Sequence, residues 1–72
     1  MKKYYVVGET YEGDQFLINE DLTTEDNLIE NLEHYGNLFD TIAQAQDVVA
    51  RYMIKNVDVE YDNTYRIEEW EE

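Results

Sequence analysis

The segment T-I-A-Q-A-Q-D-V-V-A-R-Y-M-I-K-N, Thr41–Asn56, constrains the fold more than any other part of the chain. Thr41 and Gln44 have the spacing of a capping box, in which a hydroxyl and an amide each satisfy a backbone group left free at a helix start. Asp47 and Arg51 are spaced i, i+4, which favours an ion pair on a helix. Apolar residues recur at helical spacing and form one face: Ile42, Ala45, Val48, Val49, Tyr52 and Met53. We therefore expect an amphipathic helix that must bury this face against another layer.

Three further segments have the β-branched and aromatic composition of strands: Lys3–Glu9, Asp14–Asn19 and Thr64–Trp70. Gly13 lies between the first two and can supply the positive φ of a tight turn, which predicts a β-hairpin. In the last segment, alternation places Tyr65 and Ile67 on one face. Trp70 breaks that parity, so it faces the far side of the sheet or lies past the end of the strand.

The stretch before the capped helix predicts a short helix near Thr24–Tyr35. Thr23 and Asp26 have the spacing of a weak capping motif, and Gly36 stands where a helix-terminating glycine would. Leu28, Ile29 and Leu32 recur at helical spacing within this stretch.

Together these elements predict a single α+β domain over residues 1–72. Its three-stranded antiparallel sheet would carry one main helix on one face, in the order β-β-α-β with a possible short extra helix before the main one. A chain of 72 residues buries only about 60% of its unfolded surface, and the sequence has no cysteine to add a disulfide. One helix on three strands also leaves an edge and a face uncovered, so we expect a homodimer.

The net charge is −13, and it is unevenly placed. No basic residue stands between Lys3 and Arg51, a span that holds these carboxylates: Glu9, Glu12, Asp14, Glu20, Asp21, Glu25, Asp26, Glu30, Glu33, Asp40 and Asp47. Such a chain is repelled by nucleic acid and by anionic membranes, so direct binding to either is not expected. Solubility is one explanation of the charge. The other is mimicry of a phosphate array, by which an acidic protein occupies the basic groove of a nucleic-acid-binding protein.

The sequence has no pattern of a catalytic site. Serine and cysteine are absent, and His34 is the only histidine, beside the expected turn at Gly36. Carboxylates are so abundant that a close pair carries no information. We expect no enzymatic activity and no cofactor.

One spacing resembles a calcium-binding loop. Asp58, Glu60, Asp62 and Glu69 fall at positions 1, 3, 5 and 12 of such a loop. The sixth position, however, is Asn63 in place of the glycine of the sharp turn, and Glu60 is longer than the usual third ligand. A cation, Arg66, also occupies the ninth position. We expect a loop that leads into a strand, and no metal.

Tyrosine dominates the aromatic content, but the chain lacks the positive groove that proteins binding single-stranded nucleic acid combine with stacking rings. These rings suit the core and sheet faces, where a polar tip stays in water. Tyr61, Tyr65 and Trp70 near the end of the chain are the candidate contacts with a partner or a second subunit.

Neither a signal peptide nor an apolar stretch of transmembrane length is recognisable, so we expect a cytoplasmic protein.

The opening K-K-Y-Y-V-V-G-E, the helix F-D-T-I-A-Q-A-Q-D-V-V-A-R-Y-M and the closing T-Y-R-I-E-E-W resemble the YopT-like family of small prophage-encoded uncharacterised proteins. The resemblance covers essentially the whole chain. It implies one helix, three strands and a homodimer, and it supplies no activity or functional residues. The expected helix at Thr24–Tyr35 departs from that description.

The sequence thus predicts a small, acidic, non-enzymatic, prophage-type protein that acts by binding another macromolecule. The alternative is the acidic nucleic-acid mimic that inhibits a host nucleic-acid-binding protein.

Overall fold

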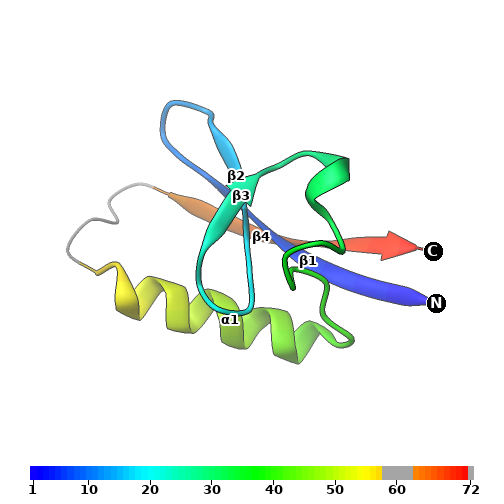
Figure 1. Ribbon diagram of the computed structural model, residues 1–72. Coiled ribbons are helices and arrows are strands. Elements are labelled where there is room, and N and C mark those ends of the chain that lie inside the picture. The colour runs from blue at the N-terminus through cyan, green and yellow to red at the C-terminus, as the bar shows by residue number, and fades with distance from the viewer. Residues whose placement is uncertain (58–62, 72) are drawn as a thin grey trace.

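The computed structural model describes residues 1–57 and 63–71, and in them one helix lies on one face of a four-stranded antiparallel sheet (Figure 1). The elements in chain order are β1 (Lys2–Glu9), β2 (Gln15–Ile18), β3 (Thr24–Asp26), the single 3₁₀ turn η1 (Ile29–Asn31), α1 (Ile42–Lys55) and β4 (Thr64–Glu71). The strand order is β3-β2-β1-β4, so β3 and β4 form the two edges of the sheet. The α+β class and the single main helix are confirmed, whereas the expected three-stranded sheet has a fourth strand.

The start of α1 has the predicted capping box. The Thr41 hydroxyl accepts a hydrogen bond from the Gln44 backbone N–H at 3.1 Å, and the Gln44 side chain accepts one from the Thr41 N–H at 3.2 Å. The Arg51 guanidinium lies 2.9 Å from the Asp47 carboxylate one turn earlier. Ala45 and Val48 are buried against the sheet, as the apolar periodicity predicts.

The hairpin between β1 and β2 is also confirmed. Gly13 has a φ of +92°, and its N–H donates to the Thr10 carbonyl at 2.9 Å to close the turn. Val7 pairs with Leu17, and Gly8 pairs with Phe16.

The predicted helix at Thr24–Tyr35 is wrong. Its first residues form β3, which pairs with β2, and only Ile29–Asn31 makes a helical turn. Like charges at i, i+4, Asp26 and Glu30, disfavour a longer helix here, and Leu28 and Ile29 are exposed. Of the apolar residues that suggested the helix, only Leu32 is buried.

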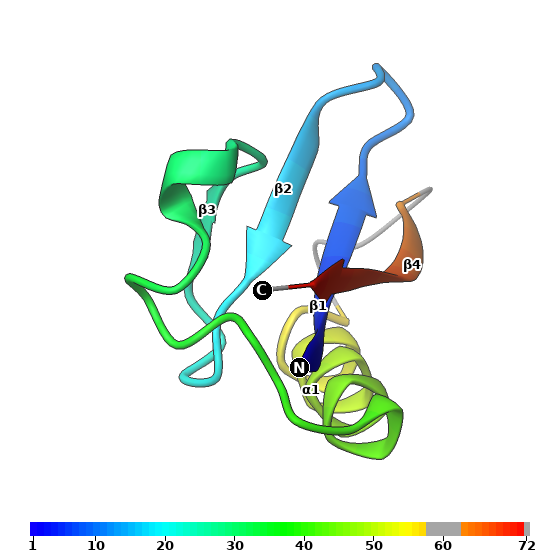
Figure 2. The same ribbon diagram turned by 90° about the vertical axis from the view of Figure 1, so that its right-hand side faces the viewer.

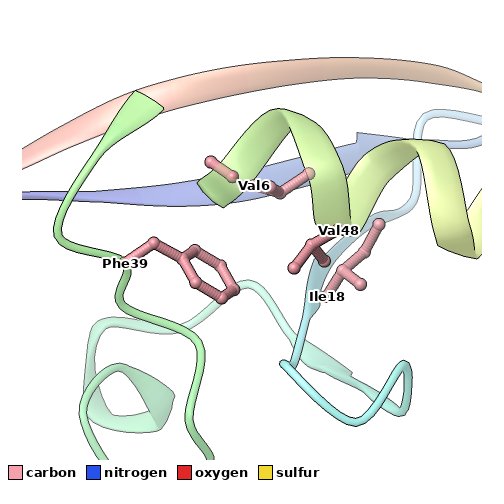
Figure 3. Packing of buried hydrophobic residues seen from close by; sticks show 5 residues of the cluster. Val6, Ile18, Phe39 and Val48 are labelled. Atoms are coloured by element: carbon pink, nitrogen blue, oxygen red, sulfur yellow. The ribbon is translucent and has the colours of Figure 1, made fainter. Parts of the chain in front are cut away.

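The main core lies between α1 and the sheet. Val6 from β1, Ile18 from β2 and Val48 from α1 meet there with Phe39, which precedes the helix (Figure 3). Phe39 is fixed because its backbone exchanges two hydrogen bonds with Tyr4, at 2.8 and 2.9 Å. This short bridge anchors the chain to β1 just before α1 begins.

Three aromatic rings pack together on the helix side of the sheet, around Gly8. Phe16, Tyr52 and Tyr65 have ring centroids 6.0 to 6.3 Å apart, with the edge-to-face or tilted geometry that aromatic pairs favour. Gly8 pairs with Phe16 on one side and with Tyr65 on the other. A Cβ atom at position 8 would come within 2.3 Å of the Phe16 ring, so the absence of a side chain makes the space that this ring occupies.

We expect Gly8→Ala to destabilise the fold by about 2 kcal/mol, because the Phe16 ring must leave its place between Tyr52 and Tyr65. Urea unfolding followed by tyrosine fluorescence measures the change. The double variant Gly8→Ala/Phe16→Leu should be less destabilised than the sum of its single variants, since the smaller side chain relieves the clash. Additive effects would contradict this account of Gly8.

The opposite face of the sheet is not bare, contrary to the expectation from the sequence. Val7 and Leu17 on that face are buried under Leu32, and Leu38 and Trp70 pack around them. The connection between β3 and α1 therefore covers part of the face that was predicted to be left for a second subunit.

Two buried asparagines hold this covering connection in place. The Asn37 amide donates to the Asn19 side-chain oxygen at 3.2 Å and to the Asn31 carbonyl at 2.8 Å, and its own oxygen accepts from the Glu33 N–H at 3.2 Å. Asn19 in turn donates to the Thr23 hydroxyl at 2.8 Å. Asn37 and Asn19 are at most 1% exposed, and every buried side-chain polar atom of the described residues has a partner.

We expect Asn37→Asp to destabilise the protein by about 3 kcal/mol at neutral pH, because the new carboxylate would be buried facing two acceptor oxygens. Burial raises the folded-state pKa of that carboxyl above its unfolded value. The penalty should therefore be absent below about pH 4, the unfolded pKa, and should grow as pH rises toward the folded pKa. Asn37→Ala is the control, since it loses the same donors without a titrating group. Urea midpoints across pH should diverge between the two variants, and parallel curves would contradict the prediction.

Candidate interaction surface

The cations of the described chain lie on β1, α1 and β4, and four of them pair with nearby carboxylates. The ion pairs join Lys2 to Glu69, Lys3 to Asp40, Arg51 to Asp47, and Arg66 to both Glu9 and Glu68, at 2.7 to 3.8 Å. Each pair has at least one member that is more than a third exposed to solvent, so each contributes little stability. Their consequence is a mixed-charge surface on the part of the molecule built by these three elements.

A second set of carboxylates has no such partners. Within residues 1–57 and 63–71, eight acidic residues from the β1–β2 turn to the end of η1 take part in no ion pair: Glu12, Asp14, Glu20, Asp21, Glu25, Asp26, Glu30 and Glu33. We call this set the acidic surface. Figure 2 shows β3 and η1, which carry part of it, on one side of the sheet and β4 on the other. At β3 and η1 the acidic surface therefore lies apart from β4, whereas its Glu20 and Asp21 line a shallow hollow together with Arg51 of α1.

Two apolar side chains project from the same region. Leu28 is 48% exposed and Ile29 is 85% exposed. Both lie at the start of η1, between Asp26 and Glu30 in sequence, and Asn31 ties this turn to the Asp26 carbonyl at 2.9 Å. The sequence pattern had assigned Leu28 and Ile29 to a buried helix face, so their exposure was missed.

Asp21 ends a chain of hydrogen bonds that begins at the buried Asn37. Asn37 donates to Asn19, Asn19 donates to the Thr23 hydroxyl, and that hydroxyl donates to the Asp21 carboxylate. The Thr23 hydroxyl and then the Thr23 backbone N–H, at 3.1 Å, lower the pKa of Asp21 below its ordinary value, because both bonds favour the charged form. The turn between β2 and β3 is thus held by a charged acceptor.

We expect Thr23→Val to raise the pKa of Asp21 toward its ordinary value of 3.8, since the largest cause of the shift is the lost hydroxyl. The folded pKa of Asp21 is depressed, so its contribution to stability is present above the unfolded pKa and lost as pH falls through the folded value. Carboxyl-carbon NMR titration measures the pKa directly. Thr24→Val, on β3, serves as control and should leave it unchanged.

The structure separates the aromatic residues predicted as partner contacts. Tyr65 lies on the helix face of β4, half-buried against Phe16 and Tyr52. Trp70 lies within β4 on the opposite face, beside the cluster of Val7, Leu17 and Leu32. The parity break in the sequence therefore reflects a residue that faces the far side. Tyr61 lies outside the described residues, and contact of Tyr65 or Trp70 with a partner stays a prediction.

The remaining candidates do not form a site in the described chain. His34 is exposed, in the turn that follows η1. Asp58, Glu60 and Asp62 of the rejected calcium pattern lie outside the described residues, and Glu69 lies in β4, where it pairs with Lys2. Among residues 1–57 and 63–71 no group of three or more histidine or acidic side chains could hold a metal ion.

Over the same ranges, α1 is too short and too polar to cross a membrane, and no other helix qualifies.

No protein family, curated protein or solved structure is found to match this chain. The function must therefore be inferred from the surfaces themselves.

Proposed function

We propose that the protein is a small, cytoplasmic, non-enzymatic binding protein whose acidic surface engages a basic macromolecular partner. The observation that supports the proposal is the uneven placement of charge: eight carboxylates without ion pairs lie between the β1–β2 turn and the end of η1, and the described cations lie on β1, α1 and β4. Charge placed for solubility alone has no reason to be concentrated in segments without a cation. Concentrated negative charge instead speeds encounter with a partner of opposite charge and orients it.

The exposed pair Leu28 and Ile29 adds to this proposal. Interfaces combine charged rims, which steer and orient, with apolar contacts that are buried on binding. Ile29, which is 85% exposed, supplies such a contact between the carboxylates of Asp26 and Glu30. The partner we propose therefore has a basic surface around an apolar recess.

Two expectations from the sequence belong to the same proposal. One is that the binding unit is a homodimer. The other is that the chain is a prophage-type protein of the YopT-like family, which rests on the resemblance of its opening, helical and closing segments.

We expect neutralisation of the acidic surface by Asp26→Asn/Glu30→Gln/Glu33→Gln to weaken partner capture from host lysate at low salt on the order of tenfold. The matched control Asp40→Asn/Asp47→Asn/Glu71→Gln removes the same number of charges from the other side. If capture of the partner depended only on total charge, the amount of partner retained would fall equally for both triple variants. Equal losses, or capture unaffected by high salt, would contradict a role for the acidic surface.

Nucleic-acid mimicry is a second candidate, favoured by the extent of the acidic surface from the β1–β2 turn to η1. A mimic and a nucleic acid compete for one groove, so duplex DNA or RNA should displace the captured protein from the immobilised chain. Retention of the partner in the presence of excess nucleic acid would favour the broader proposal and exclude mimicry of that partner's substrate.

A further inference from the structure

β4 is an edge strand of eight residues whose outer side is not covered by another strand of the described chain. Tyr4 exchanges its backbone hydrogen bonds with Phe39, on the side of β1 away from β4. Along an antiparallel strand, the backbone N–H and C=O groups of successive residues point alternately to one neighbouring strand and to the other. The backbone groups of odd-numbered β1 residues therefore bond to β4, where they meet the backbone groups of even-numbered residues. The odd-numbered residues of β4 direct theirs away from β1. The backbone groups of Ile67 and Glu69 consequently point outward, where another strand could pair with them.

A shallow groove runs beside this edge on the helix side. It has a volume of about 260 Å³ and is lined by Gln46 and Val49 from α1 and by Tyr65, Arg66 and Ile67 from β4. Gln46 and Val49 belong to a stripe at i, i+4, i+7 and i+11 on α1, and its ends are Ile42 and Met53, each about half exposed. The free edge therefore has an apolar groove along it.

We propose that a second copy of the chain occupies this edge, with the two β4 strands pairing antiparallel about a twofold axis at Ile67. The proposal rests on the homodimer proposed above and assigns its interface. The two sheets would join into one, with the α1 helices on the same face. Ile67 of the second copy would then add to the groove beside Val49.

Charge selects the register. In an antiparallel pair, side chains that stand directly opposite each other lie on the same face of the sheet. A twofold axis perpendicular to the sheet must therefore pass through a residue, which then stands opposite its own copy. Three such axes lie near the middle of β4, at Arg66, Ile67 and Glu68. An axis at Arg66 sets two arginines opposite each other, and an axis at Glu68 sets two glutamates opposite each other, both of which are unfavourable. An axis at Ile67 sets Arg66 opposite Glu68 of the second copy, twice over. Only this register is self-complementary.

The isolated chain is already arranged for these pairs. The Arg66 guanidinium lies 2.7 Å from Glu68 of its own strand, on the sheet face away from α1, and the two side chains are 45% and 43% exposed. Pairing of two strands would bring two arginines and two glutamates together as an alternating group. Each arginine would keep its own glutamate and gain that of the second copy.

Net charge opposes this association, since each copy carries −13. Added salt should therefore tighten the dimer by screening the repulsion between copies. Binding of a basic partner to the acidic surface should weaken with salt. This opposite sign separates the two interactions experimentally.

Cysteine cross-linking tests the register, because the natural chain contains no cysteine. We expect a mixture of the Arg66→Cys and Glu68→Cys proteins to form a disulfide-linked dimer under mild oxidation. In the proposed register these positions are directly opposite, with Cα atoms about 4.5 Å apart, while each position lies about 8 Å from its own symmetry copy. Each variant alone should therefore cross-link at least tenfold more slowly than the mixture. The mixture also keeps one natural Arg66–Glu68 pair.

The single-variant results decide between registers. Rapid cross-linking of Arg66→Cys alone would place the axis at residue 66, and rapid cross-linking of Glu68→Cys alone would place it at residue 68. Either result overturns the proposed register while leaving the homodimer intact. If the protein is a dimer and neither the mixture nor either single variant forms a disulfide, β4 is not the interface.

Charge exchange gives a second measurement that does not depend on oxidation. By sedimentation, Arg66→Glu and Glu68→Arg should each weaken the dimer at least tenfold, and the double exchange Arg66→Glu/Glu68→Arg should restore it. Failure of the double exchange to restore association, with the fold intact by circular dichroism, would also overturn the register. A natural chain that sediments as a monomer at about 100 μM in 0.5 M salt would overturn both the interface and the homodimer, and would leave the edge of β4 to a strand of a different protein.

Discussion

The hydrogen bond between the buried side chains of Asn37 and Asn19 fixes the part of the molecule that regular secondary structure does not. Asn19 ends β2, and Asn37 lies eighteen residues later in the connection that leads to α1. Together with the backbone bonds from Glu20 to Gly36 and between Tyr4 and Phe39, their bond holds this connection against the sheet, with Leu32 buried on one face and Phe39 on the other. A buried amide costs free energy unless all its groups are satisfied, and here each finds a partner. Without it, the segment that covers the far face would keep few contacts beyond Leu32 and Leu38.

The same network determines where the charge can go. The chain from Asn37 through Asn19 and Thr23 to Asp21 extends the buried polar contacts to the surface and shapes the turn between β2 and β3. That turn, β3 and η1 contain many of the unpaired carboxylates and no cation. The backbone beneath those carboxylates is held by hydrogen bonds that run from the buried amides of Asn37 and Asn19 through the Thr23 hydroxyl to the charged Asp21. The acidic surface is thus carried by a scaffold that does not depend on neutralising it.

The sequence predicted the elements whose signals are local. The Thr41–Gln44 capping box, the Gly13 turn and the alternation of Tyr65, Ile67 and Trp70 each depend on a few neighbouring residues, and each is found in the structure. Thr24–Asp26 could not be recognised as a strand, because three polar residues have no periodicity and pair only with β2. Leu28 and Ile29 were misassigned because helical spacing does not reveal whether a side chain is buried. The charge imbalance was evident in the sequence, but tertiary structure decides which carboxylates pair with a cation, since the ion pairs form on β1, α1 and β4 and with Asp40 just before α1.

The two proposed interactions are compatible because they use opposite edges of one sheet. In the order β3-β2-β1-β4, pairing across β4 leaves both copies of β3 at the outer edges of an eight-stranded sheet. At the usual strand spacing these edges lie about 34 Å apart, with both α1 helices on the same face. Each dimer would then present two acidic surfaces to a partner. A partner with two basic sites would bind the second acidic surface at a high effective concentration.

Separation of the acidic surfaces also limits the repulsion that dimer formation must overcome, because at physiological ionic strength charges that far apart are largely screened. The placement of one cation fits the proposed interface, because Arg66 lies on the edge strand β4 beside Glu68.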